Sequence, residues 1–199
     1  MDSAFGYFEQ NLSVIEKSLR SVSKKELDSL LQKCVLTLND GKKIVVTGLG
    51  KNIPICQKFV STMISMGLDA CFIDAVSALH GDIGIVKPGD MVIVLTKSSM
   101  TAEIVNLVEV LKKREVCYWI ITNNRNGTVA RETQNIVYAE LEHEGDIWNI
   151  IPNNSTTVNL MILQTVAVRV SELLGLSLEK NFKPNHPGGT IGAELYNDA

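Results

Sequence analysis

Hydroxyl side chains gather where an apolar run gives way to a helical pattern, in the stretch "MVIVLTKSSMT" at residues 91–101. Four hydroxyls and one ammonium group lie together there, on Thr96, Lys97, Ser98, Ser99 and Thr101. The N–H groups that open a helix lack partners and attract anions, and hydroxyl donors and a positive charge add to that attraction. Ordinary helix capping is the alternative, although a cap needs one hydroxyl rather than four. The pattern therefore predicts a phosphate-binding loop.

A second segment with features of an anion site is "TGLGKN", residues 47–52, at the end of another apolar run. Gly48 and Gly50 allow a tight turn and close approach to the backbone, and Lys51 opens the next helix. The spacing matches neither G-x-G-x-x-G nor G-x-x-x-x-G-K-[ST]. A glycine turn followed by a solvated lysine explains the segment equally well, so by itself it is a weak indication of phosphate binding.

Three further segments hold residues that could transfer protons. In "ALHGDIG" (78–84), His80 could carry a proton or could be a loop histidine held by Asp82. In "NHPGGTIG" (185–192), glycine and proline around His186 indicate a fixed loop. In "HEGDIWNIIPNNSTT" (143–157), Glu144 is a candidate general base or a merely solvated carboxylate, and the hydroxyls at 155–157 cap a helix. No spacing motif joins these residues as metal ligands, so we expect no metal site.

Alternating strand and helix patterns supply the elements that would position these residues. Residues 3–39 read as helix, with Ser23 and Glu26 as the capping box of a second helix within them. Strands are then predicted at 43–48, 69–74, 91–96, 117–122 and 135–140, and helices at 53–66, 101–113 and 155–174. This order predicts an α/β fold, a three-layer α-β-α sandwich with a five-stranded parallel sheet. Ligands bind such sheets at the carboxyl ends of the strands, where the candidate residues lie.

The 199 residues are expected to form one domain with an N-terminal helical region (1–40), an α/β core (41–182) and an irregular tail (183–199). The net charge of −3 argues against a nucleic-acid partner. Four cysteines in apolar surroundings, without a C-x-x-C motif, predict reduced core thiols. Because there is no apolar run of 18 residues and no secretory signal, we expect no membrane partner and a cytoplasmic location.

Taken together, the motifs resemble the sugar isomerase (SIS) domain and, within it, the arabinose-5-phosphate isomerase family. The similarity runs from about residue 43 to residue 192. It consists of the glycine–lysine turn, H-G-D-x-G at 80–84, P-x-x-S-T-T at 152–157 and H-P-G-G at 186–189, with the family's glutamate falling on Glu144. The long members carry C-terminal regulatory (CBS) modules, and this sequence stops before them, so we expect a short form.

The resemblance implies an aldose–ketose isomerase acting on arabinose 5-phosphate or a related phosphosugar through an enediol, without a cofactor. It makes Glu144 or His186 the carbon base, His80 an aid to ring opening, and Lys51 the stabiliser of the developing oxyanion. It also implies a homo-oligomer, a tetramer, in which a histidine can reach a neighbouring subunit's site. Other substrate contacts are expected from Gly50, Asn52, Asp82, Ser155 and Thr156.

The sequence departs from the family pattern in both predicted phosphate segments. Asn52 and Ile53 replace the usual serine and glycine, Ser99 replaces a glycine, and Met100 replaces an acidic residue. Methionine can only pack, and Lys97 adds charge where the family is neutral. These departures predict that arabinose 5-phosphate is a poor or unnatural substrate. They also keep open a second function, a sugar-phosphate-binding or sensing module with little turnover.

Overall fold

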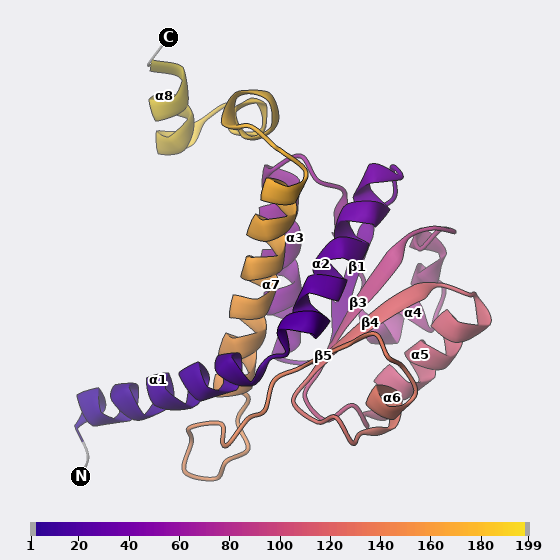
Figure 1. Ribbon diagram of the computed structural model, residues 1–199, viewed down its shortest axis with the longest axis vertical. Helices are drawn as coiled ribbons and strands as arrows, with labels where there is room; N and C mark the ends of the chain where they lie inside the picture. The colour runs from indigo at the N-terminus through magenta and orange to yellow at the C-terminus, as the bar shows by residue number, and fades with distance from the viewer. Residues whose placement is uncertain (1–2, 198–199) are drawn as a thin grey trace.

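Five parallel strands form one sheet in the computed structural model of the protein, which describes residues 3–197 (Figure 1). The strand order is β2-β1-β3-β4-β5, with β1 at Ile44–Gly48, β2 at Ala70–Phe72, β3 at Met91–Thr96, β4 at Cys117–Thr122 and β5 at Ile136–Tyr138. The α-helices are α1 (Ala4–Ser21), α2 (Lys24–Asn39), α3 (Asn52–Ser65), α4 (Ala75–Ala78), α5 (Ala102–Lys113), α6 (Thr128–Arg131), α7 (Asn154–Leu173) and α8 (Gly189–Asn197). Short 3-10 helices at Asp82–Ile85 and Lys183–Asn185 and a π-helix at Leu178–Phe182 join them. The predicted α/β fold is confirmed.

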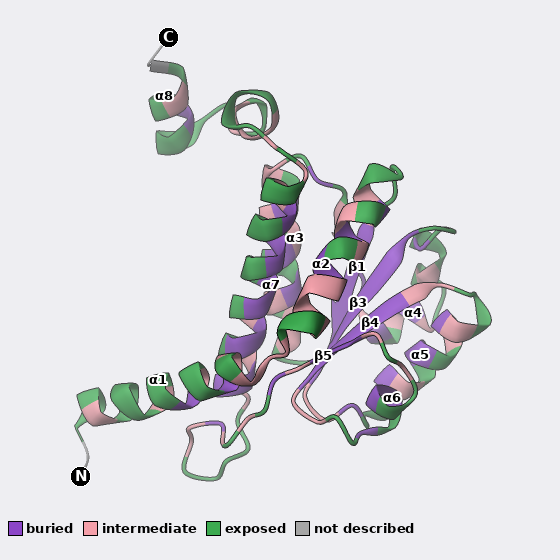
Figure 2. Ribbon diagram, viewed as in Figure 1, coloured by how far each residue is buried: buried purple, intermediate pink, exposed green. Residues whose placement is uncertain are grey.

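Apolar side chains of the strands point alternately to the two faces of the sheet and build a core on each. Along β3, Met91, Ile93 and Leu95 pack with α2, α3 and α7, while Val92 and Val94 pack with α4, α5 and α6. Burying a side chain of this size contributes roughly 1.5–3 kcal/mol. Figure 2 shows the buried residues concentrated in the strands and on the inner faces of the helices. The loops at the ends of the strands are therefore held by a packed sheet.

The N-terminal helical region divides into α1 and α2 at Ser23, as the sequence predicts. Ser23 Oγ accepts a hydrogen bond from the Glu26 N–H at 3.5 Å and caps α2. The carboxylate of Glu26 does not complete the predicted capping box. It pairs instead with Arg125 at 2.6 Å and accepts the Tyr138 N–H at 3.0 Å, because these groups of the sheet edge lie within its reach. Glu26 thereby ties α2 to β5.

The C-terminal tail, predicted to be irregular, is largely helical. Pro184 falls in the first turn of a short helix, where its missing N–H costs little, and Gly189 begins α8. The tail meets the body through Asn185, whose Nδ2 donates to the Ser65 carbonyl at the end of α3 at 3.5 Å. Figure 1 shows α8 beyond the C-terminal end of α7. By length and composition, no single helix within residues 3–197 qualifies as a membrane span; α7 and Leu178–Asn185, bent by 112°, do so only as a pair.

The order in which strands are added to the sheet changes direction between β1 and β3, which are neighbours. From β1 the chain crosses to β2 on one side and then returns to form β3 on the other. The loops after β1 and β3 therefore diverge and leave a crevice at the carboxyl edge of the sheet. These are the loops that carry Lys51 and the predicted phosphate-binding hydroxyls.

Candidate functional site

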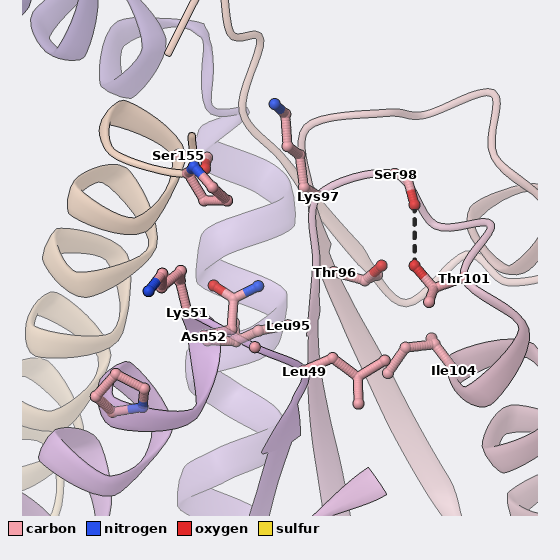
Figure 3. A pocket seen from close by; sticks show the side chains of 13 residues that line it. Leu49, Lys51, Asn52, Leu95, Thr96, Lys97, Ser98, Thr101, Ile104 and Ser155 are labelled. Carbon is pink, nitrogen blue, oxygen red and sulfur yellow. Dashed lines mark hydrogen bonds between the residues drawn. The ribbon is translucent and has the colours of Figure 1, made fainter. Parts of the chain in front are cut away.

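A cavity of about 760 Å³ opens at this crevice (Figure 3). The loops after β1 and β3 form two walls, and the start of α7 forms a third. The volume lies in the usual range for small-molecule sites. More than half of the predicted site residues meet here. The residues lining the cavity are Leu49, Gly50, Lys51, Asn52, Pro54, Leu95, Thr96, Lys97, Ser98, Thr101, Ile104, Pro152 and Ser155.

The hydroxyl loop between β3 and α5 has the geometry of an anion site. Ser98 Oγ and Thr101 Oγ1 lie 3.3 Å apart, a hydrogen bond drawn as a dashed line in Figure 3, and Thr96 Oγ1 accepts the Ser99 N–H at 3.1 Å. Thr101 occupies the N-cap position of α5, but its side chain makes no capping hydrogen bond. The first N–H groups of α5 are thus left without a side-chain acceptor, beside hydroxyls that can turn to donate. Such a helix end binds phosphate or a carboxylate.

Ser99, a predicted phosphate ligand, turns its hydroxyl away from the cavity. The residue is fully buried, and its Oγ lies 2.6 Å from Thr122 Oγ1 at the end of β4. Its backbone is left-handed, with φ of 56°. Gly127 allows the loop to lie this close, since a Cβ there would be 2.3 Å from the Ser98 carbonyl oxygen. The expectation that this hydroxyl meets the phosphate is therefore corrected: Ser99 anchors the loop to the neighbouring strand.

The loop after β1 brings Lys51 and Asn52 to the opposite wall. Gly50 has φ of 55°, which the tight turn requires. Asn52 begins α3 and lies so close to Gly48 that a Cβ at Gly48 would be 2.9 Å from the Asn52 Cβ. Figure 3 shows Lys51 and the Asn52 amide across the cavity from Ser98 and Thr101. An ammonium group and an amide thus face the hydroxyl loop.

Glu144 lies behind the cavity wall, with 0% of the residue exposed. Its carboxylate accepts hydrogen bonds from the Ser155 N–H at 2.9 Å, the Ser155 Oγ at 2.7 Å and the Asn153 N–H at 3.1 Å. It thereby occupies the N-terminus of α7, the position that a bound anion would otherwise take. Lys97 Nζ lies 2.6 Å from its Oε1 and balances the buried charge. In this arrangement Glu144 joins the hydroxyl loop to the start of α7.

His80, Asp82 and Thr156 do not line the cavity of this chain. His80 and Asp82 follow α4 and are exposed, and no hydrogen bond joins them in the described chain. The described residues therefore show no contact of the kind that the alternative, a loop histidine held by Asp82, would require. Thr156 turns its hydroxyl to the Asn153 carbonyl, at 2.8 Å, within the first turn of its own helix.

His186 follows the 3-10 helix at Lys183–Asn185, in the tail that leads from the C-terminal end of α7 to α8 (Figure 1). Its ring stacks on Phe182 with centroids 3.8 Å apart, and Nδ1 lies 2.8 Å from the Phe182 carbonyl oxygen. A 20-residue helix is about 30 Å long, and the cavity is at the other end of α7. The structure therefore does not bring His186 to the cavity of its own chain.

Asn159 supports the site and was missed by sequence reasoning. It is 1% exposed, and its Nδ2 donates to Asn52 Oδ1 at 3.0 Å. It lies four residues after Ser155, on the same face of α7. The available signal was a polar residue between Val158 and Ile162, on the part of the helix that is otherwise apolar. Apolar cavity residues left no signal, because in sequence they resemble core residues: Leu49, Pro54, Leu95, Ile104 and Pro152.

The titratable side chains that line the cavity are both lysines, Lys51 and Lys97. Lys97 is paired with Glu144, so the positive charge that favours an anionic ligand comes from Lys51. No cysteine is among the lining residues, and burial raises the pKa of Cys34 and of Cys56 to about 12, so these two thiols stay protonated. Within residues 3–197, no three side chains of His, Cys, Asp or Glu lie close enough to share a metal ion.

Comparison with known sequences gives relatives over nearly the whole chain. It is 31% identical over 196 residues to the arabinose 5-phosphate isomerase KdsD of Pseudomonas aeruginosa, covering 94% of this chain and 60% of that protein. It is 32% identical over 193 residues to the arabinose 5-phosphate isomerase KpsF of Escherichia coli, covering 94% and 57%. The chain thus spans less than two thirds of the length of these relatives.

Solved structures share the fold. A structure from E. coli in complex with arabinose 5-phosphate has a TM-score of 0.79 and 28% identity, covering 86% of this chain and 89% of that chain. A structure from Listeria monocytogenes has a TM-score of 0.83 and 23% identity, covering 94% and 100%. A sequence model of the SIS domain matches residues 37–169, from the end of α2 through most of α7. Since this match includes all five strands and every residue that lines the cavity, the chain belongs to the SIS domain family.

Proposed function

We propose that this protein is a sugar-phosphate isomerase, which interconverts the aldose and ketose forms of arabinose 5-phosphate or a related phosphosugar. The cavity at the carboxyl edge of the sheet carries the proposal. There the open N-terminus of α5 and the hydroxyls of Ser98 and Thr101 face Lys51 across a space that fits a sugar phosphate. The names of the similar proteins KdsD and KpsF, and the arabinose 5-phosphate bound in the E. coli structure, support this class of substrate.

The phosphate group would bind at the hydroxyl loop. Thr96, Ser98 and Thr101 supply hydroxyls, the first N–H groups of α5 supply further donors, and Lys97 supplies positive charge. Ser99 would act by holding the loop against Thr122. Binding the phosphate at one end leaves the sugar to extend toward Lys51.

The reaction moves a proton between two adjacent carbons and needs no cofactor. A base removes the proton from the carbon beside the carbonyl while an acid protonates the carbonyl oxygen, which gives an enediol. The proton then returns to the former carbonyl carbon, and the hydroxyl on the other carbon loses its proton and becomes the new carbonyl. Lys51 would stabilise the negative charge that develops on the oxygen. The sugar hydroxyls would be held by Gly50, Asn52 and Ser155, with Asp82 and Thr156 as further candidates.

Glu144 and His186 remain the two candidates for the carbon base. The Glu144 carboxylate is one hydrogen bond behind Ser155, and it would reach the substrate only after leaving its hydrogen bonds at the start of α7 and its pair with Lys97. His186 would have to come from a second subunit, because the length of α7 separates it from its own cavity. His80, exposed and outside the cavity, would assist ring opening under the same condition.

We therefore propose a homo-oligomer, a tetramer, with sites shared between subunits. Apolar residues on α1 support such an assembly, since Phe5, Phe8 and Leu12 are exposed on a helix that projects from the body (Figure 1). We also propose a cytoplasmic location. The thiols of Cys34, Cys56, Cys71 and Cys117 are unpaired, as in proteins of a reducing compartment.

Proton NMR with arabinose 5-phosphate in deuterium oxide tests the isomerase. The expected result is ketose formation, with exchange of the proton on the carbon beside the carbonyl. Lys51→Ala should lower kcat by about 10²-fold or more, as removal of an oxyanion-stabilising group does. A parent protein that binds pentose and hexose phosphates but neither isomerises nor exchanges any of them would overturn the proposal.

That outcome would support the second candidate, a sugar-phosphate-binding or sensing module. Two observations favour it: the titratable groups lining the cavity are both lysines, and Met100, where the family pattern implies an acid, is exposed in the hydroxyl loop. Comparing the parent with Met100→Glu on a panel of phosphosugars addresses this position. If the acid is what arabinose 5-phosphate requires, Met100→Glu should raise its turnover, whereas unchanged rates would show that Met100 carries no specificity.

A further inference from the structure

Asn159 is a buried amide on the apolar face of α7, between Val158 and Ile162 in the core. Its Nδ2 donates to Asn52 Oδ1 at 3.0 Å, while its own Oδ1 has no hydrogen-bond partner among the described residues. An unpartnered amide oxygen at 1% exposure costs stability, and a leucine of similar shape would avoid that cost. Packing alone therefore does not explain an amide at this position.

Asn52 is the group that Asn159 orients. Because Oδ1 of Asn52 accepts from Asn159, its Nδ2 is fixed on the other side, and Figure 3 shows that nitrogen turned toward the β3 loop. Asn52 lines the cavity, and in the described chain its Nδ2 donates to no protein group. Gly48 leaves the room that the Asn52 Cβ occupies. The result is an amide N–H group presented to the cavity in a defined direction.

We propose that Asn159 is a positioning residue, which fixes the Asn52 amide nitrogen as a hydrogen-bond donor to an oxygen of the bound sugar; this rests on the proposed function. Asn52 lies beside Lys51 and across the cavity from the hydroxyl loop, so the oxygen it meets belongs to the sugar and not to the phosphate. An amide donor is uncharged and selects carbonyl or hydroxyl oxygens. Asn52 and Asn159 thus favour phosphosugars that place an oxygen against the Asn52 amide nitrogen. A ligand without that oxygen would leave the amide N–H unpaired and bind more weakly.

A double-mutant cycle measures whether Asn159 acts through Asn52. Calorimetry on the intact protein gives the affinities for arabinose 5-phosphate and for inorganic phosphate in the parent, Asn52→Ala, Asn159→Leu and the double variant. Each single change should weaken arabinose 5-phosphate binding about 3- to 10-fold, as loss of one neutral hydrogen bond does, and leave inorganic phosphate binding unchanged. The double variant should bind no more weakly than Asn52→Ala alone.

Nitrogen-15 NMR adds a measurement that would not change if Asn159 only stabilised the fold. The side-chain amide signal of Asn52, assigned by its loss in Asn52→Ala, should shift when arabinose 5-phosphate is added to the parent. The same shift should be absent in Asn159→Leu. If Asn159→Leu does not fold, Asn159→Ala removes the amide without adding volume and takes its place in the cycle.

Thr37→Val is the matched control. Thr37 is also buried with an unpartnered side-chain oxygen, but it lies near the C-terminus of α2, away from the cavity-lining residues. It should leave both affinities unchanged. Parental arabinose 5-phosphate affinity in Asn159→Leu, or additive losses in the double variant, would overturn the inference while the proposed function stood. A parent that binds no sugar phosphate would overturn the proposed function itself, and the inference with it.

Discussion

Ser98 and Thr101 are the two side chains whose hydroxyls meet at the open end of α5, 3.3 Å apart. Replacing both with alanine removes two donors to a charged ligand, each worth roughly 1.5–3 kcal/mol. Affinity for a sugar phosphate should therefore fall at least about tenfold by calorimetry. Thr157→Ala is the control, because that exposed hydroxyl bonds only to the Asn153 carbonyl. Equal affinity in the double variant and the parent would mean that the phosphate binds elsewhere.

Asp90 is a buried carboxylate that joins the starts of β1 and β3. It accepts the Lys43 N–H at 3.0 Å and the Lys87 N–H at 2.7 Å, and pairs with Lys43 Nζ at 2.5 Å. Burial by itself would raise the pKa of Asp90, but the hydrogen bonds and charge of Lys43 and the Lys87 N–H outweigh it, and the pKa is lowered. A lowered carboxyl pKa stabilises the fold above the unfolded value near 4, and this contribution is lost as pH falls through the folded value.

Asp90→Asn should accordingly reduce the free energy of unfolding by about 1–3 kcal/mol at pH 7. Urea unfolding of both proteins between pH 7 and pH 2 measures the difference. The two curves should begin to converge below about pH 4 and should meet once the pH has fallen through the lowered pKa of the folded carboxyl. A constant difference down to pH 2 would show that the Asp90 charge does not contribute.

At the scale of elements, the segment between β5 and α7 is organised by Asp146. Its carboxylate accepts the N–H groups of Trp148 at 2.9 Å, Ile150 at 3.0 Å and Ile151 at 2.9 Å. Desolvation would raise the pKa of Asp146, but these backbone hydrogen bonds lower it. The segment ends at Pro152, which lines the cavity, so its conformation shapes one wall.

Asp146→Ala should release this segment and weaken sugar-phosphate binding, while Asp146→Asn, which keeps one acceptor, should have a smaller effect. Fluorescence anisotropy measures the release, because Trp148 is 64% exposed and the other tryptophan, Trp119, is buried. The Trp148 signal should lose anisotropy in Asp146→Ala. If anisotropy and affinity both matched the parent, the carboxylate would not be what holds the segment.

Elements that depend on local pattern were predictable from sequence. The strands at 91–96 and 117–122 match β3 and β4 residue for residue, because long apolar runs of β-branched residues have few alternatives. The tail was misread, because Pro184 and Gly189 look like helix breakers in sequence yet stand at helix starts. Proline and glycine mark a boundary without saying which side of it is helical.

Side-chain roles that depend on distant partners were not predictable. Glu144 reads as a loop glutamate in sequence, and only the fold brings Lys97 and the start of α7 to it. In sequence Ser99 resembles a phosphate ligand, and only the fold shows that its hydroxyl bonds to Thr122 at the end of β4. Most of the predicted residues that reach the cavity lie at or directly after the ends of β1 and β3, where the backbone leaves little freedom of position; Ser155, at the start of α7, is the exception.

At the scale of the whole molecule, the separation of His186 from its own cavity predicts a test of shared sites. Lys51→Ala and His186→Ala should each lower kcat about 10²-fold or more while binding is largely kept. If His186 serves a neighbouring subunit, mixing the two variants under exchange conditions should restore activity, because hybrid oligomers contain some intact sites. Sedimentation gives the assembly state. A monomer at micromolar concentration, or mixtures no more active than their components, would contradict the shared site.

The cavity exists only when β1 and β3 are paired, with Thr47 beside Val94 and Gly48 beside Leu95. Neither loop alone presents both Lys51 and the hydroxyls of the loop after β3, so the unfolded chain has no binding site for a sugar phosphate. A sugar phosphate that binds the native state alone must therefore raise the melting temperature, and at about 100 times its Kd it adds about 2.7 kcal/mol of stability. Melting curves in the presence of different phosphosugars would thus rank them by affinity, and the folding equilibrium itself becomes a screen for the natural substrate.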